Sequence, residues 1–276
     1  MGAELERVDW KRVTVHPTAE INVTGELAIG AGSVIGPGVV IEGTRVVIGR
    51  EAWLDRGAYI GGGSAFDPGA FLVAGDWLHM GRNGHINTAR GVTVGHEFGC
   101  GIETKVFTHG AYQSELDGFP VKFAPVTIGD RVWLPNAWVN PGVTIGSDVV
   151  VAARSLVNRD LPSGCLAGGI PAQVIKEGCY PSRGAGEQGS KGAEEQRRLE
   201  VLLRIIAEAE GIAGQPMVKM VTAGLIQLVG GETFNVVERT ISGPATEYGR
   251  VLKNQLRRHG IRFRYEERDG MWQPWT

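Results

Sequence analysis

The segment VTIGDRVWLPNAWVNPGVTIGSDVVVAARSLVNRDLPSGCLAGGIPAQVI, which runs from Val126 to Ile175, decides the fold of this chain. It repeats a step in which an aliphatic residue is followed by glycine, at Ile128-Gly129 and again at Ile145-Gly146. Glycine is abundant far beyond this segment, with 42 residues in a chain of 276. Because 42% of the residues are still hydrophobic, repeated tight turns explain the glycine content better than disorder does.

Upstream of this segment, apolar residues recur with a period of six. They stand at Val23, Ile29, Ile35 and Ile41 and, after a slip of one position, at Ile48, Leu54, Ile60, Phe66, Leu72 and Leu78. This period excludes an α-helix, whose apolar face recurs every three or four residues. It predicts short strands joined by tight turns, with about three hexads closing a triangular coil of a β-solenoid whose strands stack about 4.8 Å apart.

Several repeat positions are adjacent apolar pairs, so one member of each pair must face outward. Trp53 and Phe71 are 18 positions apart, as are Tyr59 and Trp77, and coils of three hexads would stack each couple on one outer wall. Outward aromatic residues indicate either a covering by the C-terminal segment or a buried subunit interface, and we favour the interface, in a closed ring.

The repeat is interrupted once, in the middle of the chain. It continues at Val94, Cys100 and Val106, but the next apolar residue in phase is Ile128, 34 positions after Val94. If the 16 residues of the segment 110–125 leave the coil as a protruding loop, 18 of these 34 positions remain, which is one complete turn of three hexads. A long loop that interrupts a regular scaffold is usually functional, and this arithmetic places His109 where the chain leaves the solenoid.

Composition excludes several classes of function. The net charge of −2 and the isoelectric point near 6.3 give no support for nucleic-acid binding. Three cysteines without a CxxC pair are too few for a disulfide framework, and the sequence has no apolar run long enough to predict membrane insertion. We expect a cytoplasmic protein.

The chain is predicted to contain two folded parts. Residues 12–177 form the solenoid, 178–192 are rich in glycine and serine and read as a linker, and 193–276 form a small α+β module whose role is open. In this module an amphipathic helix is expected over Ala193–Glu210, and a single strand over Thr233–Ile241. A basic cluster near its end predicts a solvated helix face, with an anionic ligand as the alternative; it comprises Arg250, Lys253, Arg257, Arg258, Arg262 and Arg264.

Three motifs together resemble the hexapeptide-repeat acyltransferases, and most closely the galactoside, maltose and polysaccharide O-acetyltransferases. They are Gly129-Asp130-Arg131-Val132-Trp133, the run from Asn140 to Gly146, and Arg159-Asp160-Leu161-Pro162 with Ala167 to Ala172. The resemblance covers about residues 15–177. It implies a left-handed parallel β-helix that is mostly β, a homotrimer, and acetyl-CoA bound as the acyl donor between neighbouring subunits.

The resemblance also implies roles for individual residues. His109 matches the histidine that acts as general base, which suits imidazole because it titrates near neutrality and can accept the proton of an attacking alcohol or amine. Asn87 matches an acceptor-positioning asparagine, with a turn-forming role as the alternative. Residues at matching acetyl-CoA positions are Trp133, Ala153, Arg154, Asn158, Arg159, Gln173 and Lys176. Two positions depart from the family, since Pro135 replaces a glycine and Arg154 a small residue.

The sequence therefore predicts an acetyltransferase that acts on a hydroxyl or amine of a sugar-like acceptor. A non-enzymatic scaffold remains an alternative because a fold alone does not give function. A γ-class carbonic anhydrase needs three convergent histidines, which the spacing of His79, His85, His96 and His109 does not favour, and no metal is expected. Cys100 suggests an acyl-enzyme with His109, but its place in the apolar phase favours a core residue.

Overall fold

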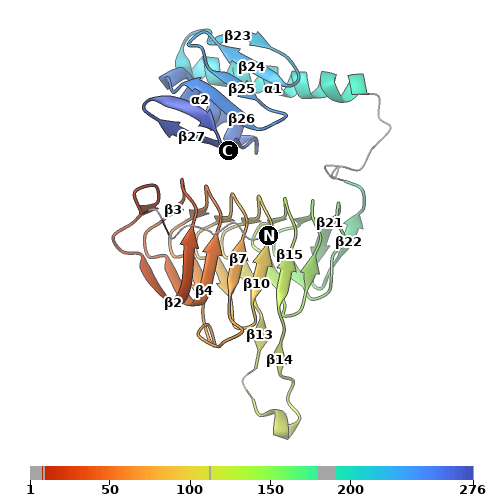
Figure 1. Cartoon of the computed structure of the whole chain (residues 1–276). Helices are drawn as coiled ribbons and strands as arrows, with labels where there is room; N and C mark the ends of the chain where they lie inside the picture. The colour runs from red at the N-terminus through yellow and green to blue at the C-terminus, as the bar shows by residue number, and fades with distance from the viewer. Residues whose placement is uncertain (1–7, 9, 112, 180–190, 276) are drawn as a thin grey trace. The chain divides into compact units, whose positions relative to one another are not determined.

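The computed structural model describes residues 8, 10–111, 113–179 and 191–275. The chain divides into two compact units, 1–185 and 186–276, and each is described by itself (Figure 1). The predicted linker falls mostly on residues 180–190, which lie outside the described part.

The first unit is a parallel β-helix with three walls, as the period of six predicts (Figure 1). The first wall is a nine-stranded sheet of β1 (Thr14–Val15), β3 (Val34–Ile35), β5 (Trp53–Leu54), β8 (His79–Met80), β11 (Gly99–Cys100), β16 (Trp133–Leu134), β19 (Val150–Val151), β21 (Leu166–Gly169) and β22 (Ala172–Lys176). Its neighbours pair in parallel until β22, which returns antiparallel to β21.

The second and third walls belong to one eleven-stranded sheet, because β2 (Glu20–Ile29) and β4 (Val40–Ile48) run without a break around the corner between them. The second wall continues with β6 (Tyr59–Gly61), β9 (His85–Asn87), β12 (Lys105–Val106), β17 (Trp138–Val139) and β20 (Leu156–Val157). The third wall continues with β7 (Leu72–Ala74), β10 (Val92–Val94), β15 (Val126–Ile128) and β18 (Thr144–Ile145).

The core is a set of aliphatic columns along the axis of the helix. Alternation along short strands sends one side chain inward, and parallel pairing places the inward residues of successive coils above one another. On the second wall this column is Ile41, Ile60, Ile86, Val106, Val139 and Val157, all fully buried. Each such side chain contributes about 1.5–3 kcal/mol by leaving water, so the column holds the coils in register.

The prediction that every coil has the length of three hexads is wrong. Leu54 pairs with Met80, 26 positions later, whereas Met80 pairs with Cys100, 20 positions later. Trp53 consequently lies beside His79 rather than Phe71, and Tyr59 lies beside His85 rather than Trp77.

The cause is an insertion between β6 and β7. The segment 62–71 separates these strands, whereas the shorter segment 88–91 separates β9 and β10 in the next coil. The first segment is six residues longer than the second, which is one period of the repeat. Apolar residues therefore continue in phase through a segment that leaves the coil. Phe66, which fits the period, is 46% exposed.

The segment that interrupts the repeat in the middle of the chain protrudes from the coil, but it is a β-hairpin and not the loop without strands that was predicted over 110–125 (Figure 1). Val94 pairs with Ile128, which confirms the predicted spacing across the interruption. The excursion contains two strands that sequence reasoning missed, β13 (His109–Gly110) and β14 (Lys122–Phe123), with a short 3-10 helix at Glu115–Asp117.

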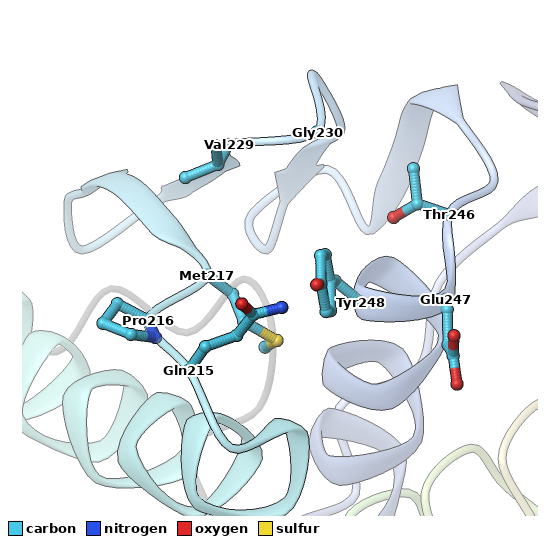
Figure 2. A pocket seen from close by; sticks show the side chains of 8 residues that line it. All are labelled: Gln215, Pro216, Met217, Val229, Gly230, Thr246, Glu247 and Tyr248. Atoms are coloured by element: carbon cyan, nitrogen blue, oxygen red, sulfur yellow. The ribbon is translucent and has the colours of Figure 1, made fainter.

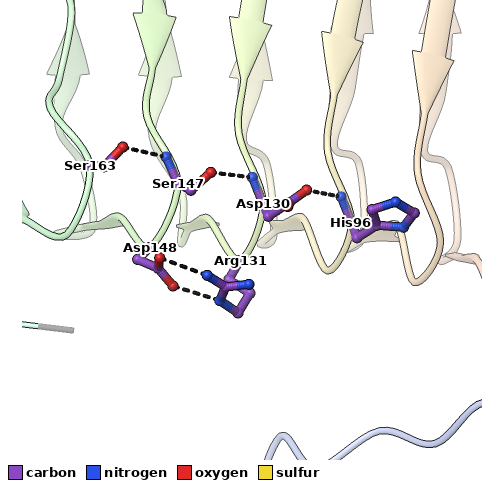
Figure 3. A network of polar contacts seen from close by, with 6 residues as sticks. All are labelled: His96, Asp130, Arg131, Ser147, Asp148 and Ser163. Carbon is purple, nitrogen blue, oxygen red and sulfur yellow. Dashed lines mark hydrogen bonds and ion pairs between the residues drawn. The ribbon is translucent and has the colours of Figure 1, made fainter. Parts of the chain in front are cut away.

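Polar side chains connect successive coils at the corner that follows the third wall (Figure 3). His96 N–H donates to Asp130 Oδ1 at 2.7 Å, and Asp130 N–H donates in turn to Ser147 Oγ at 3.0 Å. Ser147 N–H continues the series by donating to Ser163 Oγ at 3.0 Å. Each corner side chain therefore accepts a hydrogen bond from a backbone N–H of the preceding coil. These N–H groups lie in turns, where the hydrogen bonds between strands cannot satisfy them.

The Asp-Arg step of the Gly129–Trp133 motif has a structural role at the same corner (Figure 3). Arg131 donates to both carboxylate oxygens of Asp148, at 2.6 and 2.7 Å. Asp148 is 6% exposed, and this hydrogen-bonded pairing raises the pKa of Arg131. The bidentate geometry is the strong form of this ion pair and fixes two adjacent coils relative to each other.

The second unit is α+β, as predicted. Its sheet has the order β23-β24-β25-β26-β28-β27, and the element bounds are α1 (Lys191–Ala213), β23 (Val218–Val221), β24 (Leu225–Leu228), β25 (Thr233–Asn235), β26 (Thr240–Pro244), α2 (Glu247–Arg258), β27 (Tyr265–Arg268) and β28 (Met271–Pro274). The single strand expected over 233–241 is instead the hairpin β25–β26.

The core of this unit packs the two helices against the sheet. Leu202 and Ile206 of α1 are buried with Phe234, Leu252 and Trp272 in one cluster. The basic cluster is partly neutralised, since Arg250 pairs with Glu267. In the described part of the chain, no helix is both long and apolar enough to cross a membrane.

Candidate functional site

His109 is the first residue of the hairpin and follows the second-wall strand β12 closely. Its imidazole lies beside the end of β9, the strand of the preceding coil. Its Nδ1 lies 2.8 Å from Oδ1 of Asn87, the last residue of β9. Asn87 is 2% exposed, whereas the ring of His109 is only partly buried. Sequence reasoning predicted both residues, and the structure brings them into direct contact.

The hydrogen bonds of Asn87 define the tautomer of His109. Its Nδ2 donates to the carbonyl oxygen of Gly61 at 3.2 Å, so Oδ1 is the atom that faces His109. A carbonyl oxygen only accepts, and Nδ1 of His109 must therefore carry the hydrogen. In the neutral ring the lone pair then lies on Nε2, which is the arrangement that a general base requires.

Thr108 holds Asn87 from the other side. Its hydroxyl group is buried and donates toward Oδ1 of Asn87 at 2.8 Å, while it accepts from Arg90 N–H at 3.1 Å. Asn87 therefore sits in a network whose polar atoms are all engaged within the protein, and such a network restricts the imidazole to one orientation.

The second strand of the hairpin covers one face of the imidazole. Phe123 is the cross-strand partner of His109, and their rings stack with centroids 5.3 Å apart. The guanidinium carbon of Arg90 lies 5.7 Å from the centre of the Phe123 ring. The hairpin thus supplies an aromatic surface beside the base, which shields it from bulk water on that side.

A row of rings along the second wall leads away from the site, and sequence reasoning missed it. The rings of Tyr59 and His85 stack at 4.7 Å, His85 meets Phe107 edge-on at 5.7 Å, and Phe107 meets Trp138 at 5.6 Å. The sequence does indicate that Tyr59 and Trp138 face outward, because each precedes an inward aliphatic residue. That their rings belong to one row follows only from the register, which pairs Tyr59 with His85 and Lys105 with Trp138.

Two groups in this row have displaced pKa values. Burial, reinforced by the hydrogen bond to Glu42 at 2.5 Å, raises the pKa of Tyr59 to about 12. Burial also lowers the pKa of His85, and the nearby positive charge of Lys105 acts in the same direction. Both groups are therefore neutral at physiological pH.

The lowered pKa of His85 predicts a loss of stability in acid. Above about pH 6.5, the ordinary pKa of histidine, the ring is neutral in the folded and unfolded states and contributes no pH dependence. Below that pH the unfolded state takes up the proton first, so stability falls until the pH passes the lowered folded-state pKa. We expect His85→Phe, which keeps a ring against Tyr59, to show a smaller decrease in Tm than the native chain between about pH 7.5 and 5.5, the range that spans the ordinary pKa of histidine.

The matched control for this measurement is His16→Phe, at an exposed histidine of the same unit. That variant is expected to keep the native decrease in Tm. If His85→Phe loses as many degrees as the native chain over this range, protonation of His85 is not linked to unfolding.

The residues predicted to contact acetyl-CoA lie on the last coils. Trp133 is 41% exposed on the first wall, where the absence of a side chain at Gly99 lets its indole lie against the neighbouring strand. Arg154 has a φ of 59° in the turn after β19. Ala153 shares that turn, Asn158 and Arg159 are exposed after β20, and Gln173 and Lys176 are exposed on β22.

Cys100 does not belong to the site. Its side chain is completely buried, and this burial raises the pKa of its thiol to about 12. A thiolate is therefore not accessible at neutral pH, and the prediction of a core residue is confirmed. In the described ranges, no three His, Cys, Asp or Glu side chains gather into a group that could hold a metal ion.

The second unit has an open pocket of about 400 Å³ at the start of α2 (Figure 2). Figure 2 shows Met217 and Gln215 facing Tyr248, and the full lining is Gln215, Pro216, Met217, Val229, Gly230, Thr246, Glu247 and Tyr248. These residues include neither an imidazole nor a thiol, so the pocket offers no counterpart to the base at His109.

The fold and the site define a class of protein, a parallel β-helix of the hexapeptide-repeat type with a histidine at the base of a protruding hairpin. No protein-family model matches the chain. The chain is 31% identical over 122 residues to the galactoside O-acetyltransferase of Escherichia coli K12, a match that covers 40% of this chain and 59% of the relative. It is 34% identical over 107 residues to the putative colanic acid biosynthesis acetyltransferase WcaF of the same organism, covering 38% and 58%.

Among solved structures, a galactoside acetyltransferase in complex with coenzyme A aligns over 49% of this chain and 64% of its own, with 28% identity and a TM-score of 0.41. The matched region spans about three fifths of the length of the two sequence relatives. The resemblance of this chain to the hexapeptide-repeat acetyltransferases is confirmed by the two sequence relatives.

Proposed function

We propose that this protein is an acetyl-CoA-dependent acetyltransferase that transfers an acetyl group to a hydroxyl or amine of a sugar-like acceptor, with His109 as the general base. The observation that carries the proposal is the contact between His109 Nδ1 and Asn87 Oδ1 at 2.8 Å, which leaves the lone pair of the neutral imidazole on Nε2. The sequence likeness to a galactoside O-acetyltransferase supports the reaction class.

The reaction uses one proton relay. Nε2 of His109 accepts the proton of the acceptor O–H or N–H while the acceptor atom attacks the thioester carbon. The tetrahedral intermediate then collapses, the carbon–sulfur bond breaks, and the imidazolium returns its proton to the departing thiolate. Asn87 stabilises the imidazolium through the Nδ1–H hydrogen bond and acts as a positioning residue for the base, because its own amide atoms are engaged by Gly61, Thr108 and His109.

The donor substrate would be held by the last coils of the β-helix. Arg154, Arg159 and Lys176 are exposed cations, which suits the phosphates of coenzyme A. Trp133 offers an exposed indole against the donor, and Ala153, Asn158 and Gln173 complete the proposed contacts. The donor supplies the activated acetyl group as a thioester.

The proposal extends to assembly and location. Trp53, Trp133 and Trp138 are 37%, 41% and 52% exposed in the single chain, and the proposed homotrimer would bury exposed aromatic side chains of this kind between copies. In this proposal the β-helix, residues 12–177, carries the reaction, and no role in it is assigned to residues 193–276. The enzyme is placed in the cytoplasm, where acetyl-CoA is made.

An acceptor screen with detection of released thiol tests the function. The full chain is incubated with acetyl-CoA and a panel of neutral sugars, amino sugars and uronic acids, and thiol release is compared with an acceptor-free control. Acceptor-dependent release together with an acetylated product in mass spectrometry is the expected result. Binding of acetyl-CoA without release on any acceptor would favour a non-enzymatic role.

A further inference from the structure

The insertion loop, residues 62–71, is a built part of the β-helix. Ala65 is 1% exposed, and its N–H donates to Gly62 O at 2.9 Å. Its carbonyl oxygen accepts from Thr44 N–H of β4 at 3.1 Å. Further turns connect Asp67 N–H to Ser64 O and Ala70 N–H to Asp67 O, at 3.1 and 2.9 Å. The loop is therefore held both by its own turns and by the strand beside it.

The beginning of this loop approaches the catalytic imidazole. A β-carbon at Gly63 would lie 3.7 Å from Nε2 of His109, the nitrogen that carries the lone pair. A β-carbon at Gly62 would lie 2.8 Å from Nδ2 of Asn87, and its φ of 99° is in the region that glycine tolerates. Gly63 has no such positive φ, and a β-carbon there would lie at an ordinary van der Waals distance, so neither backbone strain nor a clash requires glycine at this position.

The end of the same loop approaches the hairpin through Arg90. A β-carbon at Gly69 would lie 3.3 Å from the guanidinium group of Arg90, and that group also lies over the ring of Phe123. Since Phe123 stacks on His109, the loop and the hairpin border the imidazole from two sides and Arg90 lies near both.

Glu42 adds a hydrogen-bonding group at the base of the loop. Its Oε1 accepts from Tyr59 O–H at 2.5 Å and from Gly62 N–H at 3.2 Å. Gly62 and Gly63 are consecutive, with Cα atoms about 3.8 Å apart, so this carboxylate and the imidazole border the same small region. The carboxylate of Glu42 can accept hydrogen bonds from an acceptor substrate, and the guanidinium of Arg90 can donate them. This combination suits a compound with several hydroxyl groups.

We propose that the insertion loop forms one side of the acceptor site and that Gly63 keeps open the approach by which a polyhydroxyl acceptor reaches Nε2 of His109. This inference rests on the proposed function for the identity of the reaction, but the access of a small reagent to Nε2 is independent of it. Gly63 is thus a specificity-determining position, because a larger side chain introduced there would occupy the place of the acceptor.

Carbethoxylation of His109 by diethyl pyrocarbonate, followed by peptide mass spectrometry of the full chain, tests this access. Nδ1 is engaged by Asn87, so the reagent reports on Nε2. We expect Gly63→Val to slow modification of His109 at least ~10-fold and Gly63→Ala to have a smaller effect, since a methyl group 3.7 Å away is in ordinary van der Waals contact. Rates measured at several pH values separate access from a change in the pKa of the imidazole.

The matched control is Asp67→Val, which adds the same side chain at an exposed position of the same loop. It is expected to leave the modification rate at the native value. With the best acceptor of the screen, Gly63→Val should lower kcat/KM at least ~10-fold while acetyl-CoA binds as before. Modification of His109 in Gly63→Val at the native rate, in a variant with the native Tm, overturns the proposal, whereas a native chain without transfer activity refutes only the proposed function.

Discussion

Replacement of His109 by alanine is expected to lower kcat for acetyl transfer by about 10²- to 10⁴-fold, the range that a positioned general base contributes. The reason is the loss of the imidazole nitrogen that faces the proposed acceptor site, since in His109 the other nitrogen is bound to Asn87. The side chain is only partly buried, so the β-helix should keep its Tm. The measurement is thiol release at saturating acetyl-CoA, together with calorimetric titration of the donor.

Imidazole added in solution provides the control for this variant. The space vacated beside Phe123 can receive the free base, and partial recovery of kcat that follows the pH dependence of imidazole would show that a proton acceptor is what the variant lacks. His109→Gln, which fills the space without basicity, should stay inactive under the same conditions. Native turnover in His109→Ala would falsify the assignment of the base.

Replacement of Asn87 by alanine is expected to lower kcat by about 10- to 100-fold and to destabilise the β-helix as well. The variant removes the bonds of the Asn87 amide to Gly61 O, to the Thr108 hydroxyl and to His109 Nδ1–H. Gly61 O still accepts from Thr88 N–H, and the Thr108 hydroxyl can still donate to the backbone oxygen of residue 87. Each hydrogen bond lost contributes about 0.5–1.5 kcal/mol net, so a decrease in Tm should accompany the loss of activity. Without Oδ1 the imidazole can also adopt the other tautomer, in which Nε2 carries the hydrogen and cannot accept one.

Asn87→Asp separates positioning from stability. A carboxylate still accepts from Nδ1–H and selects the same tautomer, but it cannot donate to Gly61 O, so stability should fall while much of kcat remains. The negative charge also favours the imidazolium, and the acidic limb of the pH–rate profile should therefore move to higher pH. A profile that stays at the native position in this variant would show that Asn87 does not act through His109.

The two parts of the chain differ in how directly the sequence reveals them. In the β-helix the inward residue of each strand is selected by a local rule, alternation along a short strand, and this rule recurs every coil. The interval between Val94 and Ile128 was therefore readable as one coil plus an excursion, and the pairing of these residues confirms it. The second unit lacks such a repeat, and its hairpin β25–β26 was read as one strand because the turn between the two strands carries no strong signal.

The insertion loop shows where periodicity misleads. Its additional length preserves the phase of the repeat, so no pattern of apolar residues can distinguish it from a hexad of the wall. Only the pairing of Trp53 with His79 and of Tyr59 with His85 shows that this coil is longer than the one that follows it. The same pairing creates the row of rings beside the site and brings Gly63 next to His109.

The sequence by itself determined the β-helix, the excursion after Val106 and the histidine that precedes it, because these depend on residue type and spacing along the chain. The tertiary structure alone decided which residues surround that histidine. Three residues around it, Asn87, Gly63 and Phe123, are 22, 46 and 14 positions away in the sequence. They meet His109 because the stacking of coils and the pairing of the hairpin strands bring distant positions together. Which positions meet depends on the length of each coil and not on any local pattern.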